Sequence, residues 1–413
     1  MRPQPSSDAN VPAQPRGSSA EVLLIFLRLG CLSFGGPIAH LGYFQKEFVE
    51  RRRWCSASTL AELIALAQSL PGPASSQVGF ALGILRSGWP GGLAAWLGFT
   101  LPSALLMLAF AYGTRFLSAG FGPGLLHGLQ LAAVAVVAQA VFSMQRSLAP
   151  DGQRIVLAIA AAGIALFAPG HFATLLAVGV GAVAGLLIFR SRGSEPAESA
   201  AVEHTTLRLS RSTGVAAAVL FLAILLLSPL LVRLAPVQGI AIFSTFYRSG
   251  ALVFGGGHVV LPLLENAVVA PGLVSQQSFL AGYGAAQAMP GPLFTFAAYL
   301  GASVRPALHP VVNGLLALVG VFLPGLLAMA AVLPFWSGLK QNADFRAALK
   351  GINASVVGVL CAALIHPLWT STVHTWKDFS IALLAFALLT YRRVQPWIVV
   401  AGTALTCILL KFV

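Results

Sequence analysis

The chain contains two copies of one long repeat, and each copy carries apolar segments that glycine and proline interrupt. Residues 26–36 match residues 246–256 at an offset of 220, and both copies end in Phe-Gly-Gly. Residues 68–73 match residues 287–292 at an offset of 219, and both copies end in Pro-Gly-Pro. A Leu-Pro pair then follows in each copy. This constant order at a nearly constant offset indicates duplication of one structural unit.

Apolar stretches of about 17–25 residues recur outside these breaks, and a helix needs that length to cross the core of a bilayer. Hydrophobic residues make up 57% of the sequence and charged residues only 9%, whereas soluble domains have about 25% charged residues. An ordinary soluble enzyme is therefore excluded. The net charge of +13 comes from basic residues scattered in short loops, which is typical of a membrane protein and not of a nucleic-acid-binding surface. We expect an all-α integral membrane protein embedded in the lipid bilayer.

The two copies also define the domain organisation. A charged linker separates them, and one further apolar run follows the linker without a counterpart before the first copy. One extra crossing inserts the second copy upside down. The expected segments are a disordered N-terminal tail (1–21), a first repeat (22–190), a cytoplasmic linker (191–212), an extra transmembrane helix (213–234) and a second repeat (239–413).

The distribution of Lys and Arg predicts the same inversion. Residues 46–53 are rich in Lys and Arg, whereas the equivalent loop at 265–278 has none. Residues 337–350 are basic, whereas the equivalent loop at 114–122 has a single Arg. Because positive charge favours the cytoplasmic side, this antisymmetry indicates opposite membrane orientation. We expect two inverted-topology repeats with nine full crossings, in which each broken segment is a re-entrant hairpin that enters and leaves on one side.

The breaks are the main candidates for a binding site. Gly and Pro at membrane depth release backbone groups from helical hydrogen bonds, which is tolerated only inside protein or beside water. A half-helix that starts at a break presents unpaired N–H groups and a partial positive charge, which suits an anion. Kinks for tight helix packing are the alternative. The candidate break residues are Phe34, Gly35, Gly36, Pro37, Pro71, Gly72, Pro73, Phe254, Gly255, Gly256, Gly257, Pro290, Gly291 and Pro292.

Polar side chains flank the breaks in both repeats and are candidates to contact the same anion. They are Arg28 and Arg248, Gln68 and Gln287, and His40 and His258. Arginine offers a planar fork of donors to an oxyanion, and histidine can also hold a proton. The alternatives are that the arginines reach the membrane interface, that the glutamines join helices and that the histidines are merely hydrogen-bonded.

The sequence gives no sign of enzyme chemistry. The four cysteines lie far apart and show no CxxC or Cys/His spacing, so we expect no disulfide framework, metal site or cofactor. No HExxH, GxSxG or paired acid is present, and an intramembrane enzyme would need such a group. Acids are scarce at membrane depth, so an anion is favoured over a cation as the transported ion.

Four motifs taken together resemble the chromate ion transporter family in its long, two-domain form. They are FGGPIAH at 34–40, PGP at 71–73, FGGG at 254–257 and AQAMPGP at 286–292. The resemblance covers residues 22–190 and 240–412. It departs from the family pattern at 270–273, which lacks a counterpart of Trp54.

This resemblance implies transport of chromate across the bacterial inner membrane, normally as efflux that confers resistance. Chromate is a tetrahedral dianion like sulfate, which agrees with the helix-end site. The resemblance places functional weight on Arg28, Gly35, Gly36, Pro37, His40, Pro71, Gly72 and Pro73, with the matching second-half residues. Transport of sulfate or another tetrahedral oxyanion, with sulfate as a competitor of chromate, is the nearest alternative. An anion channel is another, and a homodimer is left open.

Cysteines introduced on the two sides of the membrane test the inverted topology. In intact cells without native cysteines, an impermeant thiol reagent should label the variant Gln276→Cys and not Arg52→Cys. The reason is that equivalent loops of inverted repeats face opposite sides. Labelling of both positions contradicts the inversion.

Overall fold

The computed structural model describes residues 17–114, 122–168, 173–190, 210–254, 257–305, 309–339 and 341–410. Within these ranges the chain is helical and contains no strand. The N-terminal tail up to residue 16, the linker 191–209 and the candidate residues Gly255 and Gly256 lie outside the described residues.

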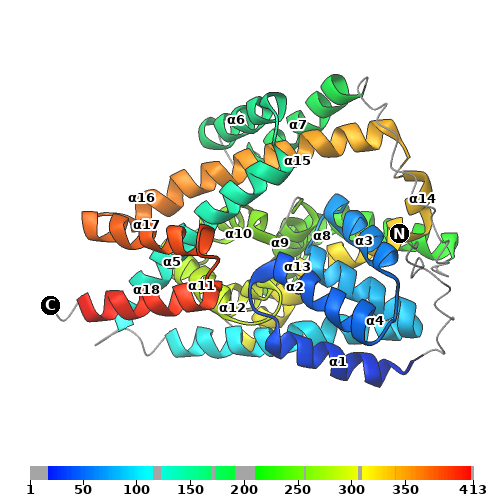
Figure 1. The fold of residues 1–413 in the computed structure, drawn as a ribbon, viewed down its shortest axis with the longest axis horizontal. Helices are drawn as coiled ribbons and strands as arrows, with labels where there is room; N and C mark the ends of the chain where they lie inside the picture. The colour runs from blue at the N-terminus through cyan, green and yellow to red at the C-terminus, as the bar shows by residue number, and fades with distance from the viewer. Residues whose placement is uncertain are drawn as a thin grey trace, which may run out of the picture.

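The first repeat and the extra helix follow one another in Figure 1 from blue to green. Their elements are α1 (Ser19–Leu32), α2 (Gly36–Phe44), the π-helix η1 (Gln45–Arg51), α3 (Ala57–Ser69), α4 (Ala74–Gly113), α5 (Gly122–Leu148), α6 (Gly152–Phe167), α7 (Ala173–Phe189) and α8 (Arg211–Leu234).

The second repeat contains the same series of elements with additional short turns. They are α9 (Gln238–Ala251), the 3-10 helix η3 (Gly257–Val259), α10 (Val260–Val268), α11 (Gln276–Ala288), η4 (Leu293–Thr295), α12 (Phe296–Ser303), α13 (Pro310–Val332), η5 (Leu333–Phe335), α14 (Trp336–Leu339), α15 (Ala343–Ala363), the π-helix η6 (Leu364–Trp369), α16 (Thr370–Thr372), α17 (Trp376–Thr390) and α18 (Pro396–Leu410).

Local sequence explains where these helices begin. Ser56 and Ser275, which are equivalent in the two repeats, cap α3 and α11 by accepting a hydrogen bond from the third backbone N–H that follows. Each of these helices then ends just before Pro-Gly-Pro, where proline prevents continuation. Asp151 caps α6 in the same way.

Among the described residues, five helical stretches are long and apolar enough to cross a membrane, so the protein is a multi-pass membrane protein. They are Ala74–Gly113, Gly122–Leu148, Arg211–Leu234, Pro310–Phe335 and Ala343–Thr372. α4 is kinked at Ser87 and Gly88, whose backbone angles are not helical, so it has two limbs. The helices α6, α7, α17 and α18 contain 15 to 17 residues, or about 25 Å at 1.5 Å per residue.

Helices of one repeat pack against helices of the other (Figure 1). α5 and α18 run antiparallel, because Gly124 packs on Cys407 and Gly128 packs on Ala404. The equivalent pair, α15 and α7, approaches closely where Gly351 meets Gly181. Small residues at these contacts allow the backbones to come close, as is typical of membrane helices.

The interrupted segments form half-helices of 8 to 14 residues, for example α1 and α12, which is short of the roughly 20 residues of a full crossing. α1 packs along the first limb of α4. Phe26 contacts Gly79 in the middle of this pair, and Glu21 pairs with Arg86 at its base. α1 and the first limb of α4 therefore both extend from the Glu21–Arg86 pair to the breaks. Re-entry from a single side of the membrane stays a prediction.

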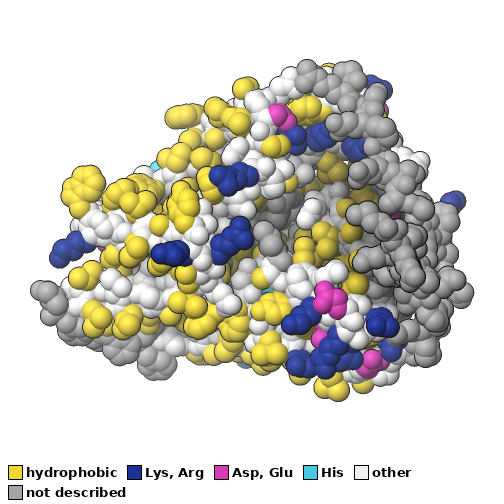
Figure 2. Space-filling view, in the orientation of Figure 1, with side chains coloured by type: hydrophobic (Ala, Val, Ile, Leu, Met, Phe, Trp, Pro, Cys, Tyr) yellow, Lys and Arg dark blue, Asp and Glu magenta, His cyan; other side chains and the backbone are white. Residues whose placement is uncertain are grey.

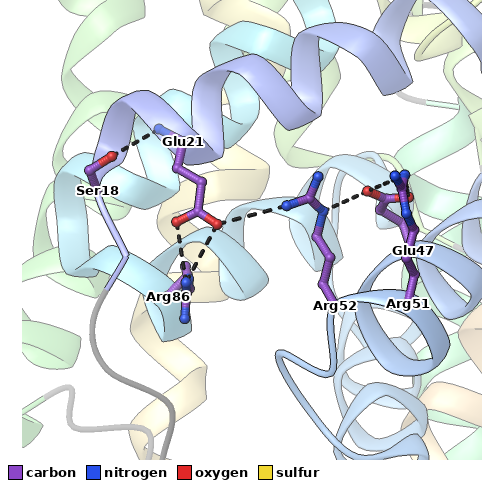
Figure 3. Close-up of polar contacts among 6 residues, drawn as sticks. All are labelled: Ser18, Glu21, Glu47, Arg51, Arg52 and Arg86. Carbon is purple, nitrogen blue, oxygen red and sulfur yellow. Dashed lines mark hydrogen bonds and ion pairs between the residues drawn. The ribbon is translucent and has the colours of Figure 1, made fainter.

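An ion network joins the base of α1 to α4 and η1 (Figure 3). Arg86 Nη2 lies 3.2 Å from Glu21 Oε2, and Arg52 Nη1 lies 3.8 Å from Glu21 Oε1. Arg52 Nε also donates to Glu47 Oε1 at 2.6 Å, and Arg51 contacts the same carboxylate. A single ion pair at a surface adds little to the stability of the fold. Here, however, the shared carboxylates of Glu21 and Glu47 connect three elements of the first repeat.

Hydrophobic side chains cover broad areas of the visible surface, while Lys and Arg are gathered in separate groups (Figure 2). On the helix α8, only a small part of its apolar stretch is buried within the protein. Exposed apolar helix surface of this extent is what lipid contact requires.

Candidate functional site

Backbone hydrogen bonds join the breaks of one repeat to the breaks of the other. The N–H of Gly72 donates to the C=O of Val253 at 2.7 Å. The N–H of Gly291 donates to the C=O of Ser33 at 2.9 Å. Gly72 and Gly291 are equivalent in the repeat, as are Ser33 and Val253. Each repeat therefore satisfies a backbone group that the break in the other repeat has released.

We call this meeting point the break junction. It consists of residues 33–37, 70–73, 252–254, 257 and 289–292.

The break junction lies at mid-length of two long helices. Gly72 packs against Gly325 of α13, and Gly291 packs against Ser103 of the second limb of α4. Gly325 and Ser103 each follow the Leu-Pro pair of their repeat, so these two contacts are also equivalent. A site at this depth is remote from both ends of the long helices, as expected for a transporter site near the bilayer midplane.

Two buried side chains of the first repeat brace the break junction. His40 Nε2 lies 3.2 Å from the C=O of Ser33, and its Nδ1 lies 3.2 Å from Ser75 Oγ. Gln77 Nε2 donates to the C=O of Pro71 at 2.9 Å. Both ring nitrogens of His40 therefore have partners, which favours the structural interpretation of this residue over anion contact.

The two Phe-Gly-Gly breaks also touch. A Cβ atom on Gly257 would lie 3.4 Å from Pro37 Cγ. α2 and α4 begin at the junction, after Gly35 and Pro73 respectively, and neither helix has a side-chain cap. Their first N–H groups and partial positive charges are therefore directed towards the junction.

Several buried polar atoms without a hydrogen-bond partner among the described residues belong to the break motifs or to the helix α4 that follows the first Pro-Gly-Pro. They include the hydroxyl groups Ser33 Oγ, Ser76 Oγ and Thr100 Oγ1, and one acceptor, Gln77 Oε1. The first three side chains belong to residues no more than 2% exposed. Each such group costs about 1–3 kcal/mol when it is left unpaired, so the three hydroxyl groups are candidate donors to a bound acceptor.

The other predicted polar side chains are exposed or already have partners, and Gln287 is a hydrogen-bond partner of Tyr283. Arg28 and Arg248 are exposed on α1 and α9, and neither forms an ion pair among the described residues. Gln68 is exposed as well. His258 contacts Tyr283, with Nδ1 2.7 Å from the hydroxyl oxygen. Direct anion contact by these side chains stays a prediction.

Two cavities lie beside the half-helices that leave the junction. The first, of about 420 Å³, reaches from Phe34 and Gly35 along α2 to Lys46 and Arg393. Phe34 packs there against Trp397 of α18, with ring centroids 6.1 Å apart.

The second cavity, of about 340 Å³, lies between α9, α10 and the start of α7, and is lined by Arg248, Asn266 and Thr174. Asn266 is the repeat equivalent of Lys46. In each case a hairpin of one repeat meets the last helix of the other repeat.

Sequence reasoning missed the hydroxyl groups on α4 and the basic residue Arg393 as parts of one site. Ser76 and Thr100 are small polar residues in a long helix, and nothing local distinguishes them from packing residues. The Leu-Pro pair was a usable signal, because Ser103 and Gly325 follow it directly. Arg393 is far from Lys46 in sequence, and only the packing of α18 against α2 brings them together.

The profile of the family described as Chromate transporter matches residues 20–186 and 240–408. The chain belongs to the chromate transporter family. Its two matched regions are the two repeats, and the α8 helix lies between them.

Three relatives of this chromate transporter family member cover most of its length. A chromate transport protein of Pseudomonas aeruginosa is 33% identical over 377 residues, which is 88% of this chain and 85% of the relative. A probable chromate transport protein of Synechococcus elongatus is 28% identical, covering 92% of both chains. A chromate transport protein of Cupriavidus metallidurans is 26% identical, covering 98% of this chain and 96% of the relative. No solved structure matches the chain.

Alanine at Gly72 and at Gly291, the glycines whose N–H groups donate to the other repeat, should destabilise this chromate transporter family member unequally. Gly72 has φ +117° and Gly291 has φ +88°, and a side chain in such a conformation costs about 1–3 kcal/mol. In Gly72→Ala the new Cβ would lie 2.7 Å from the backbone Cα of Gly325. In Gly291→Ala it would lie 2.8 Å from Ser103 Oγ, which can rotate away.

We expect Gly72→Ala to lower the Tm of the purified protein in detergent more than Gly291→Ala does. Gly163→Ala is the control, because a Cβ there meets nothing within 4 Å. Equal Tm values for Gly72→Ala and Gly163→Ala would show that the close contact between Gly72 and Gly325 at the break junction does not stabilise the fold.

Proposed function

We propose that this chain is a secondary transporter that exports chromate across the bacterial inner membrane. The anion binds at the break junction, and access alternates between the two sides through relative movement of the repeats. The observation that carries the proposal is the set of unpartnered buried hydroxyl groups of Ser33, in the junction, and of Ser76 and Thr100 on α4, in a member of the chromate transporter family.

The chemistry of these donors fits a tetrahedral oxyanion. Hydroxyl groups donate to oxygen, and hydrogen bonds to a charged acceptor are about twice as strong as neutral ones. The uncapped starts of α2 and α4 add backbone N–H groups and positive partial charge. A dianion gains more from such dipoles in a water-poor site than it would at the protein surface.

The difference between the two cavities supports export. The topology expected from the Lys and Arg distribution places the cavity with Lys46 and Arg393 on the cytoplasmic side, where its charge attracts a dianion. The cavity on the opposite side has Asn266 at the position of Lys46. An anion is thus gathered from the cytoplasm more strongly than from outside.

The accumulation of radiolabelled chromate in energised bacterial cells tests this function. Cells that contain the protein should accumulate less chromate than cells that lack it, and collapse of the proton gradient should restore the control level. Excess sulfate measures selectivity, because a site that recognises only charge and shape would lose chromate export in its presence. Unchanged chromate accumulation, together with altered sulfate accumulation, would make sulfate the substrate.

The variant Thr100→Val separates substrate binding from folding. Removal of an unpartnered buried hydroxyl should leave the Tm unchanged or raise it, since the group gains nothing in the empty protein. Loss of one hydrogen bond to a charged ligand weakens binding by about 1.5–3 kcal/mol. The half-saturating chromate concentration should therefore rise about tenfold or more.

Thr403→Val is the matched control, because Thr403 is also buried but already bonds to the C=O groups of Val399 and Val400 within α18. Equal chromate transport by Thr100→Val and the unmodified protein would remove Thr100 from the site.

A further inference from the structure

A third cavity, of about 300 Å³, contains a buried acid. It lies between α10, the end of α15 and the facing ends of α6 and α7, and its polar lining includes Glu265, Asn266, Gln276 and His366. Glu265 is only 8% exposed. Gln276 Nε2 donates to its Oε1 at 2.7 Å. The carboxyl group thus has one amide partner and an opening to the cavity.

The surroundings of Glu265 supply no counter-charge. Among the described residues, no Lys, Arg or His forms an ion pair with it. His366 of η6 is the other titratable residue of the cavity, and it is exposed. The other elements packed on α10 are η3, α9 and α15. η3 carries His258, which contacts Tyr283, and α9 carries Arg248, which lines the neighbouring cavity. α15 carries Asp344, Arg346 and Lys350 in its first half and Cys361 near its end. A carboxyl group in this setting can change its protonation state without breaking an ion pair.

The position of Glu265 relates it to the anion path. Asn266, the next residue, lines both this cavity and the one beside Arg248. The repeat equivalent of Glu265 in the first half is Gln45, which cannot ionise. An acid at this repeat position is therefore present in the second half only, on the half-helix α10 that follows the second Phe-Gly-Gly break.

We propose that Glu265 is the proton-coupling site of the transporter, and this rests on the function proposed above. Its carboxylate takes up a proton from the outer cavity, and its neutral form no longer repels a dianion that arrives there from the junction. When the anion has left, the proton is released towards the cytoplasm as access reverses. One chromate dianion thus moves outwards while one proton moves inwards, and Glu265 ends each cycle in its starting state.

Two assays on the purified full chain in proteoliposomes separate coupling from transport. Exchange of labelled for unlabelled chromate at equal pH needs only binding and alternation. Accumulation of chromate driven by an imposed pH gradient needs the proton site as well. In Glu265→Gln we expect chromate exchange to persist, while gradient-driven accumulation falls to the level of protein-free vesicles.

Control variants make the result specific. Glu50→Gln changes an exposed acid on the other side of the junction and should keep both activities. Glu265→Asp retains an acid and should keep part of the gradient-driven accumulation. Undiminished gradient-driven accumulation in Glu265→Gln overturns the proposal. Loss of exchange together with accumulation also overturns it, since Glu265 would then serve binding or folding.

A measurement on the unmodified protein does not depend on any variant. A pH-sensitive dye trapped inside the vesicles should report proton movement opposite to that of chromate. Chromate exchange without such movement would overturn proton coupling and leave the transport function standing. Absence of chromate exchange by the unmodified protein would instead contradict the proposed function itself.

Discussion

The structure depends on one constraint, which is that every backbone group released at a helix break needs a partner away from water. The hydrogen bonds from Gly72 to Val253 and from Gly291 to Ser33 meet this constraint by crossing between the repeats. Because the donors come from the Pro-Gly-Pro breaks and the acceptors from the region of the Phe-Gly-Gly breaks, the two motifs need each other. This accounts for their occurrence together in both halves of the chain.

These hydrogen bonds between the repeats also mark the limit of what the sequence could predict about the fold. Repeats, breaks and long apolar helices can be recognised from sequence patterns, so the all-α membrane fold and the positions of the interruptions were predictable. The kink at Ser87 and Gly88, where the backbone angles are not helical, divides α4 into two limbs. The pairing of breaks between repeats was not predictable in detail, because Gly72 and Val253 lie in opposite halves of the chain and no local pattern links them.

The candidate site was predictable in its backbone and much less so in its side chains. Glycine and proline interrupt an apolar helix for a local steric reason, and the described break residues do meet at the junction. Arginine, glutamine and histidine near a break can serve packing, the membrane interface or a ligand, and Arg28 is exposed while His40 is fully hydrogen-bonded. Equivalent positions of the two repeats also differ in their hydrogen bonding. Ser76 corresponds to Thr295, whose hydroxyl is satisfied by the C=O of Pro292, so the unpartnered donors belong mainly to the first repeat.

The interlocked breaks also affect how the protein is made. The partner of each Gly N–H lies in the opposite repeat, so the first repeat leaves the ribosome with its Pro-Gly-Pro break unsatisfied. The chain from Gly72 to Val253 has to be synthesised before the two residues can meet, which takes on the order of ten to forty seconds at about 5–20 residues per second. During that interval the insertion machinery or neighbouring water has to shield the open break, and premature release of the first half would leave an incomplete membrane segment.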